Sequence, residues 1–148
     1  MRIHGARTAL AALSALAAVT LSTAPAGATV FEQGISVHPY AHISADGKVT
    51  LSGTYHCTLP SPAGTTMQIS AAVVQGRTRV AFSGGSAVCD GAEHTWRAGG
   101  SLRYAPDVRQ GRARAEARLQ EIRFSGLLPS SVDTVAQDGR EIVLPARR

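Results

Sequence analysis

The sequence has no asparagine and a single lysine, Lys48, whereas alanine, glycine and arginine are abundant. A GC-rich genome produces this bias through codon usage, so we expect the source to be a high-GC bacterium. Aromatic side chains are also few, with one Trp, three Tyr and three Phe. So small a set offers few candidates for stacking on nucleic-acid bases, which disfavours nucleic acid as a partner.

Long apolar runs are absent except for one stretch near the N-terminus. This Ala/Leu/Val-rich stretch, Thr8 to Leu21, follows Arg2 and Arg7 and is too short to span a bilayer. Small residues then lead to Ala26-Gly27-Ala28, an A-x-A cleavage site. This three-part layout is typical of a secretory signal peptide.

We therefore expect cleavage after Ala28, with the A-x-A at residues 24–26 as the second choice. The chain then divides into a signal peptide over residues 1–28 and one secreted domain over residues 29–148. No second apolar segment is long enough for a membrane span. We expect the mature protein to be extracellular or loosely associated with the cell envelope.

The predicted mature chain is only weakly basic. Loss of Arg2 and Arg7 leaves 13 of the 15 Lys+Arg residues, against 10 Asp+Glu, an excess of three positive charges. This small excess gives little electrostatic reason to bind nucleic acid, which export also disfavours.

Cysteine occurs only twice, as Cys57 and Cys89. An even pair in an exported protein predicts a disulfide. The loop-entropy estimate for a ring of about 33 residues is roughly 3.5 kcal/mol of stabilisation. A catalytic thiol would instead need a reducing compartment and a neighbouring base. The histidines match no compact zinc pattern, so we expect no metal and no cofactor.

Apolar and polar residues alternate strictly from Lys48 to Cys57. Period two with one apolar side predicts a half-buried antiparallel strand. The preceding Asp46-Gly47 pair is a hairpin signal. The alternating segment 35–37 should pair with this strand across the turn, with Pro39 marking an edge or a break.

Turn signals divide the remaining chain into short segments. The expected strands lie at residues 66–75, 77–82, 87–89, 93–98 and 140–144, and the expected turns lie at residues 76, 83–86, 90–91 and 138–139. This spacing predicts an all-β protein, a single immunoglobulin-like β-sandwich of about seven to eight antiparallel strands.

Residues 112–122 favour helix by composition, because Ala, Arg, Glu and Leu are good helix formers. A helix would gather only Ala115, Leu119 and Ile122 on one stripe, too few to dock it. Alternation instead places Ala113 to Leu119 at every second position on one face. The pattern therefore predicts a strand.

The segment 89–96, C-D-G-A-E-H-T-W, contains Asp90, Glu93 and His94, which makes it a candidate loop site. Asp-Gly after a strand is first of all a turn, because Asp bonds its own backbone and Gly accepts positive φ. In an extended segment His94 shares a face with Trp96, which we expect in the core. We therefore favour a structural role, a turn followed by a strand, for the segment 89–96, and we assign no catalytic residue.

Seven of the basic residues lie between Arg97 and Arg123. If residues 112–118 form a strand, then Arg112, Arg114 and Arg118 line its solvent face, with Glu116 among them. Such a surface could bind anionic cell-wall material. A solvated polar face enriched in arginine by the GC bias is the alternative, and the favoured one.

Two segments, D-G-K-V-T-L-S-G-T-Y-H-C (46–57) and A-V-C-D-G-A-E-H-T-W (87–96), are specific. With them the chain resembles a secreted actinobacterial (Streptomyces-like) family, domain of unknown function 6299, over residues 35–144. The resemblance implies export, the disulfide and the bacterial source. It implies no catalytic residue, because that family has no assigned activity.

We therefore expect an exported, non-enzymatic β-sandwich that acts as a binding or envelope-associated module. Its partner would be an anionic cell-wall polymer or an extracellular protein, and we expect a monomer. One alternative is an inhibitor of extracellular proteases that uses the loop from Thr58 to Thr66. Another is a small secreted hydrolase that uses His94 with Asp90 or Glu93.

Overall fold

The computed structural model describes residues 33–58 and 64–146, which contain eight strands and no helix. The predicted signal peptide and its cleavage site lie outside the described residues, as does most of the loop between Thr58 and Thr66. Within the described ranges, no helix has the length and apolarity that a membrane span requires.

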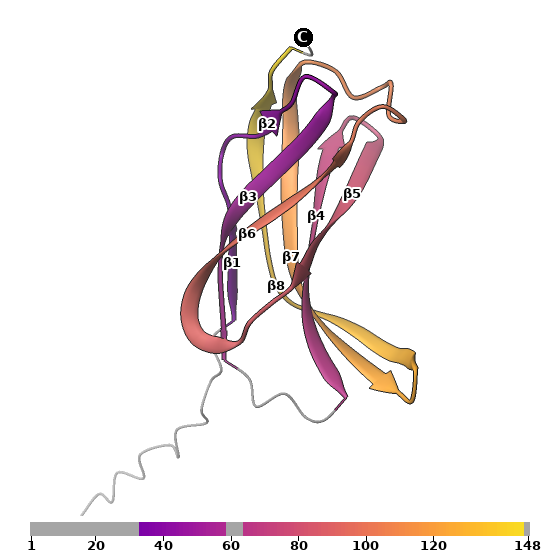
Figure 1. Ribbon diagram of the computed structural model, residues 1–148. Helices are drawn as coiled ribbons and strands as arrows, with labels where there is room; N and C mark the ends of the chain where they lie inside the picture. The colour runs from indigo at the N-terminus through magenta and orange to yellow at the C-terminus, as the bar shows by residue number, and fades with distance from the viewer. Residues whose placement is uncertain (1–32, 59–63, 147–148) are drawn as a thin grey trace, which may run out of the picture.

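The eight strands pair into two antiparallel sheets that pack face to face (Figure 1). Sheet A has β3 at its centre, paired with β6 on one side and with β1 and β2 on the other. Sheet B has the order β5-β4-β7-β8. This arrangement confirms the predicted all-β sandwich. The strands are β1 (Gly34–Val37), β2 (His42–Ile43), β3 (Lys48–Thr58), β4 (Thr65–Gln75), β5 (Thr78–Ser86), β6 (Asp90–Ser101), β7 (Gly111–Ser125) and β8 (Leu128–Leu144).

The core lies between the sheets, and period-two alternation decides which side chains enter it. On β3 the odd-numbered positions from Val49 to Cys57 face inward, as predicted. The strand predicted at residues 112–122 is also confirmed, since it forms most of β7 and buries its apolar positions. Sheet B supplies Met67, Ile69, Ala71, Val73, Ala113, Ala115, Ala117 and Leu119 to the core.

The predicted pairing of residues 35–37 with β3 is confirmed, with Ile35 opposite Tyr55. The turn at Asp46-Gly47 joins β3 to the short strand β2, and Gly47 has the positive φ, 78°, that this turn requires. Residues 38–41, including Pro39, therefore cross from β1 to β2 along the edge of sheet A.

Three predicted turns are wrong, because residues 83–86, 90–91 and 138–139 lie within strands. Asp90 and Gly91 begin β6, where Asp90 pairs with Thr58 of β3. Residues 83–86 belong to β5. The register between β4 and β5 shifts next to Ile69, and Gly85, opposite Ile69, adopts the positive φ of 81° at this irregularity. Asp138 and Gly139 lie within β8, opposite Ala117 and Glu116 of β7. Cross-strand pairing along the whole of β7 overrides the local preference of Asp-Gly for a turn.

Residues 87–89 were predicted to be a strand, but they connect β5 of sheet B to β6 of sheet A. The Ala87 amide still donates to the Met67 carbonyl of β4 at 2.8 Å, and tertiary contacts hold the rest of the crossing. The Val88 amide donates to the Tyr55 hydroxyl at 3.0 Å, and Cys89 is covalently bonded to Cys57.

Trp96 lies in the core at 3% exposure and joins three strands of sheet A. Its indole N–H donates to the carbonyl of Ser36 in β1 at 2.9 Å. The bond passes over Gly53 of β3, where an added Cβ would lie 1.8 Å from that carbonyl oxygen. Glycine at position 53 is therefore what lets the tryptophan reach β1.

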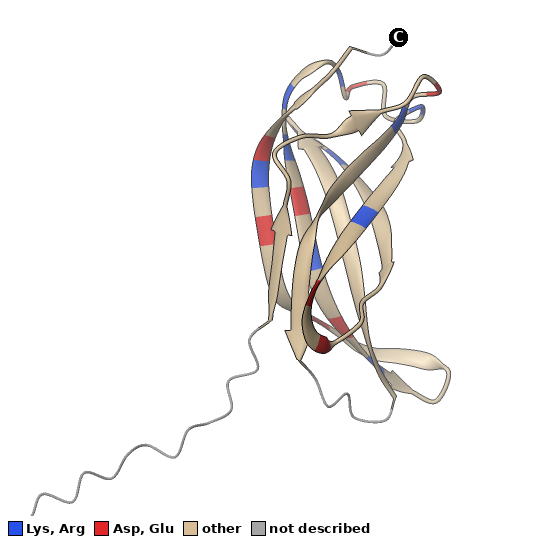
Figure 2. Cartoon of the chain, turned by 60° about the vertical axis from the view of Figure 1, so that its left-hand side comes forward, with Lys and Arg blue, Asp and Glu red and all other residues tan. Residues whose placement is uncertain are grey.

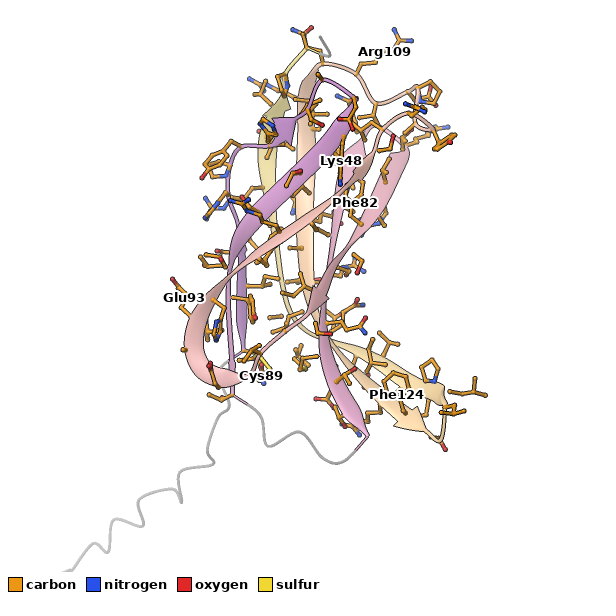
Figure 3. All side chains as sticks on the ribbon, in the orientation of Figure 1. Lys48, Phe82, Cys89, Glu93, Arg109 and Phe124 are labelled. Carbon is orange, nitrogen blue, oxygen red and sulfur yellow. A yellow bond between two sulfur atoms is a disulfide. The ribbon has the colours of Figure 1, made fainter. Side chains whose placement is uncertain are left out.

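The ends of β7 and β8 project from the body of the sandwich as a hairpin (Figure 1). Gly126, with φ 65°, makes its turn. Leu127 is 98% exposed and Leu128 is 73% exposed, while Phe124 lies near the base of the tip (Figure 3). The tip is apolar and faces solvent.

We predict that Gly53→Ala lowers the free energy of unfolding by more than about 3 kcal/mol, beyond the usual overpacking cost, since the methyl group would collide with backbone. Urea denaturation followed by the fluorescence of the single tryptophan measures this loss. Thr95→Ala, on the outer face of β6, is the control and should cost less than about 1 kcal/mol. Equal losses in the two variants would contradict the role of Gly53.

Candidate binding site on sheet A

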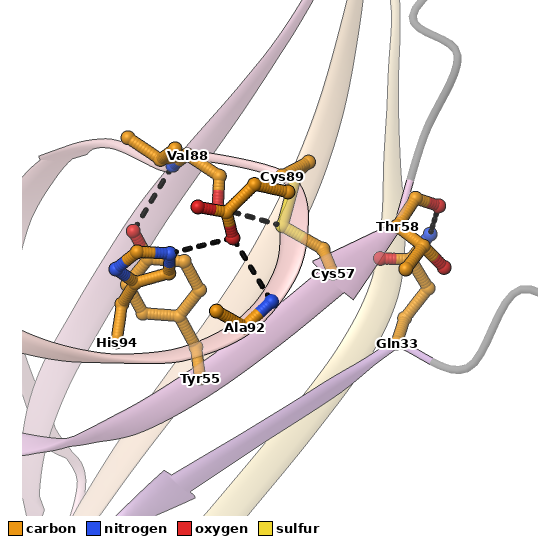
Figure 4. The surroundings of a disulfide bond; sticks show 9 residues. Gln33, Tyr55, Cys57, Thr58, Val88, Cys89, Ala92 and His94 are labelled. Carbon is orange, nitrogen blue, oxygen red and sulfur yellow. Dashed lines mark hydrogen bonds and ion pairs between the residues drawn. A yellow bond between two sulfur atoms is a disulfide. The ribbon is translucent and has the colours of Figure 1, made fainter.

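The predicted disulfide is present, and it ties the end of β3 to the crossing that precedes β6 (Figure 4). Cys57 is fully buried. Since residues 87–89 make no ladder with β3, the covalent bond fixes where the chain enters sheet A. Its estimated contribution is roughly 3.5 kcal/mol, a large part of the ~5–15 kcal/mol typical of a domain.

Asp90 and His94, two of the predicted loop-site residues, lie together beside this disulfide. His94 Nε2 is 2.8 Å from Asp90 Oδ1, and the Ala92 amide donates to the same oxygen at 2.9 Å. The hydrogen bond from His94, with that from Ala92, holds the pKa of Asp90 below its usual range. The His94 ring also stacks on Tyr55 at 5.5 Å (Figure 4).

Glu93, the third loop-site residue, points to the opposite face of β6 and away from the sandwich (Figure 3). It lies opposite His56, whereas His94 lies opposite Tyr55 on the inner side. Among the described residues, the contacts of His94 include no serine, threonine or free thiol. The Asp90–His94 pair thus fastens the bend at the start of β6, where Gly91 has φ 81°.

The three predicted arginines, Arg112, Arg114 and Arg118, share the outer face of β7, as their spacing indicated. Glu116 lies among them and accepts a hydrogen bond from Arg79 of β5, while Arg114 Nε lies 3.6 Å from its other oxygen. The bond from Arg79, aided by the positive charges of the neighbouring arginines, holds the pKa of Glu116 below its usual range.

This arginine face contains charges of both signs. A depression of about 450 Å³ is lined by two arginines and two carboxylates, and red and blue bands interleave along β7 and β8 (Figure 2). Arg112 lines a smaller depression together with Arg114 and Glu141. The lining residues of the larger depression are Arg114, Glu116, Ala117, Arg118, Gln137, Asp138 and Gly139.

The outer face of sheet A has a different chemical character. The outward positions of β3 are Lys48, Thr50, Ser52, Thr54 and His56, and none of them is apolar. Ser36 and Thr54 hydroxyls bond across β1 and β3 at 2.9 Å. On β6 the outward residues are Glu93, Thr95 and Arg97. This face is a row of hydrogen-bonding groups on three neighbouring strands.

A cleft of about 270 Å³ opens on this face, lined by Tyr40, His42, Thr50, Ser52 and Arg97. Strand register builds it, because His42 of β2 lies opposite Thr50 and Arg97 of β6 lies opposite Ser52. β3 forms the floor, the segment between β1 and β2 forms one wall, and β6 forms the other.

Tyr40 is 62% exposed, yet its ring is held in place. It stacks on His38 with ring centroids 5.4 Å apart, and its hydroxyl lies 3.3 Å from His38 Nδ1. The same nitrogen lies 3.2 Å from the Ser52 hydroxyl in the floor. A backbone bridge between Tyr40 and Val143 of β8 anchors the segment.

Sequence reasoning missed this cleft. The signal available was the segment H-P-Y-A-H (38–42) next to a strand with a wholly polar outer face. The histidine pattern was tested against metal sites alone. No group of three or more metal-ligating side chains occurs in the part of the chain that the structure describes. The cleft offers hydroxyls, an exposed aromatic ring and one guanidinium, the groups that bind a hydroxyl-rich ligand.

We predict that Glu116→Gln lowers the free energy of unfolding by at most about 1 kcal/mol at neutral pH, by removing the carboxylate that Arg79 and Arg114 contact. The folded-state pKa lies below the ordinary 4.5, so the stabilisation is complete above that pH and disappears as the pH falls through the lowered value. Urea denaturation across this range tests it, with Glu93→Gln as control. A difference that does not change with pH would contradict the assignment.

The comparisons with known proteins show a family and give weak structural likenesses. No match is found among curated proteins. A solved structure of the Pseudomonas fluorescens alkylpurine DNA glycosylase AlkC, bound to DNA containing an abasic site analog, is 15% identical with a TM-score of 0.40. The match covers 78% of this chain but only 30% of that chain, and a likeness this low supports no functional argument. A family model matches residues 31–146, which include the whole sandwich, so the chain belongs to the family of unknown function DUF6299.

Proposed function

We propose that this protein is an exported, non-enzymatic binding module that recognises a hydroxyl-rich polymer of the cell envelope through the outer face of sheet A. The observation that supports the proposal is the cleft, in which an exposed but fixed tyrosine lies beside a floor of hydroxyl groups. Sugars present C–H faces that pack on aromatic rings and hydroxyls that bond to Ser, Thr and His.

The geometry of the face suits a chain ligand better than a buried small molecule. Pockets for drug-sized ligands enclose ~300–1,000 Å³, and this cleft of about 270 Å³ is open. It therefore fits one unit of a polymer. The hydrogen-bonding row along β3 extends from Lys48 to His56 and offers contacts to neighbouring units.

The scaffold also suits binding, because strands and a disulfide hold the groups of the face in place. Thr50 and Ser52 lie on the central strand of sheet A. Thr50 pairs with β2 on one side and with β6 on the other, while Ser52 pairs with β6 and its carbonyl accepts a hydrogen bond from the His38 amide. Such a platform loses little conformational entropy on binding. The arginine face of β7 stays a predicted second surface for anionic material.

The alternatives have less support. Most of the loop between Thr58 and Thr66, on which protease inhibition would depend, lies outside the described residues. A hydrolase based on His94 would use the contact with Asp90, but Glu93 faces away from that pair. Binding therefore remains the proposal.

Export predicts a defined mass. Protein from the culture supernatant should correspond to residues 29–148 and be two hydrogens lighter than the dithiol, because Cys57 and Cys89 are joined. Reduction should lower the free energy of unfolding by about 3 kcal/mol. Retention of residues 1–28, or two free thiols, would contradict export or the disulfide.

Binding is tested with cell-wall polysaccharide isolated from a high-GC Gram-positive bacterium, by co-sedimentation and calorimetry with the disulfide-bonded protein. We expect Tyr40→Ala to weaken binding about tenfold, through loss of the stacking surface. Tyr104→Ala is the matched control, since this 88% exposed tyrosine lies outside sheet A and should change affinity less than about twofold. Failure of the wild type to bind would end the proposal.

A further inference from the structure

We infer that the cleft selects saccharide units that carry an oxyanion, a carboxylate or a phosphate, and that Arg97 binds this group while Tyr40 stacks on the sugar ring. The inference rests on the proposed function and adds the chemistry of the ligand. The inference concerns Arg97 of β6, which is not one of the three β7 arginines that the sequence indicated.

The charges around Arg97 support a ligand that itself carries an anionic group. Arg79, Arg114, Arg123 and Arg140 each lie within about 3.6 Å of a carboxylate of the protein. Arg97, among the residues that the structure describes, takes part in no ion pair, and none of the five residues lining the cleft is acidic.

The carboxylate on the same face of β6 is too far from Arg97 to neutralise it. Glu93 lies four residues along the extended strand, which corresponds to roughly 13 Å between Cα atoms. At that separation an exposed charge is largely screened at physiological ionic strength. The guanidinium thus gives one end of the cleft a positive charge that neither Glu93 nor any residue lining the cleft offsets.

The spacing of the two walls matches an acidic sugar. Tyr40 lies on the β1–β2 side of β3 and Arg97 lies on β6, so about two strand spacings, or roughly 10 Å, separate them. A pyranose ring against Tyr40 would extend its acidic substituent across the hydroxyls of Thr50 and Ser52 toward the guanidinium. The planar fork of arginine binds carboxylate or phosphate oxygens through two parallel hydrogen bonds.

The test compares an anionic polysaccharide with its uncharged ester and adds a phosphate polymer as a second source of oxyanions. Calorimetry with the disulfide-bonded protein uses polygalacturonate, its fully methyl-esterified form, and a polyol phosphate polymer. We expect wild type to bind at least one anionic polymer about tenfold more tightly than the neutral ester, which is the size of effect expected for charge-assisted hydrogen bonds. Preference for the carboxylate or for the phosphate polymer identifies the source of the oxyanion.

Arg97→Gln should remove this tenfold preference, so that the anionic polymer binds no more tightly than the neutral ester. Arg77→Gln, at an exposed position in the turn between β4 and β5, is the matched control for loss of one positive charge and should change affinity less than about twofold. Thermal unfolding confirms that each variant is folded.

Three outcomes would overturn the inference. Equal binding of anionic and neutral polymers would disprove the oxyanion site and leave the proposed function standing. Equal losses in Arg97→Gln and Arg77→Gln would show general electrostatic attraction in place of a site. No binding of any polymer, the envelope polysaccharide included, would remove the proposed function and the inference together.

Discussion

The register between β3 and β6 is the constraint on which the rest of the structure depends. Trp96 lies opposite Gly53, and its hydrogen bond to the Ser36 carbonyl holds β1, β3 and β6 in one alignment. Because side chains alternate between the faces of a strand, a slip of one residue would expose Trp96 and bury Arg97. The same contact that completes the core therefore also places the guanidinium at the outer cleft.

The two sheets use the same alternation for different surfaces. The outer face of β7 combines arginines with Glu116. Ion pairs of this carboxylate with Arg79 and Arg114 neutralise part of the arginine charge within the protein. On the outer face of β3, hydroxyl and imidazole groups predominate and bond to uncharged neighbours, as in the contacts of Thr54 with Ser36 and of Ser52 with His38. Such hydroxyl and imidazole groups are held in place and can exchange their hydrogen bonds for hydrogen bonds to a ligand. Sheet A is therefore the better candidate for recognition.

The segment 89–96, with its dense set of reactive groups, is explained by the chain path. Cys89 joins Cys57, Asp90 and His94 fasten the bend at Gly91, and Trp96 enters the core. Glu93 points outward, opposite His56 at one end of the candidate face. The grouping in sequence reflects the sharp passage from sheet B to sheet A, where covalent and side-chain contacts replace ladder hydrogen bonds.

Local patterns in the sequence determined the all-β class, the inner faces of β3 and β7, and the pairing of the cysteines. Those features depend on period-two burial and on an even thiol count, which are visible without the fold. Only the tertiary structure decided that residues 83–86 and 138–139 continue strands, because pairing with β4 and β7 outweighs local turn preference. It also decided the cleft, since Tyr40, Ser52 and Arg97 come from three segments whose side chains meet only through cross-strand register.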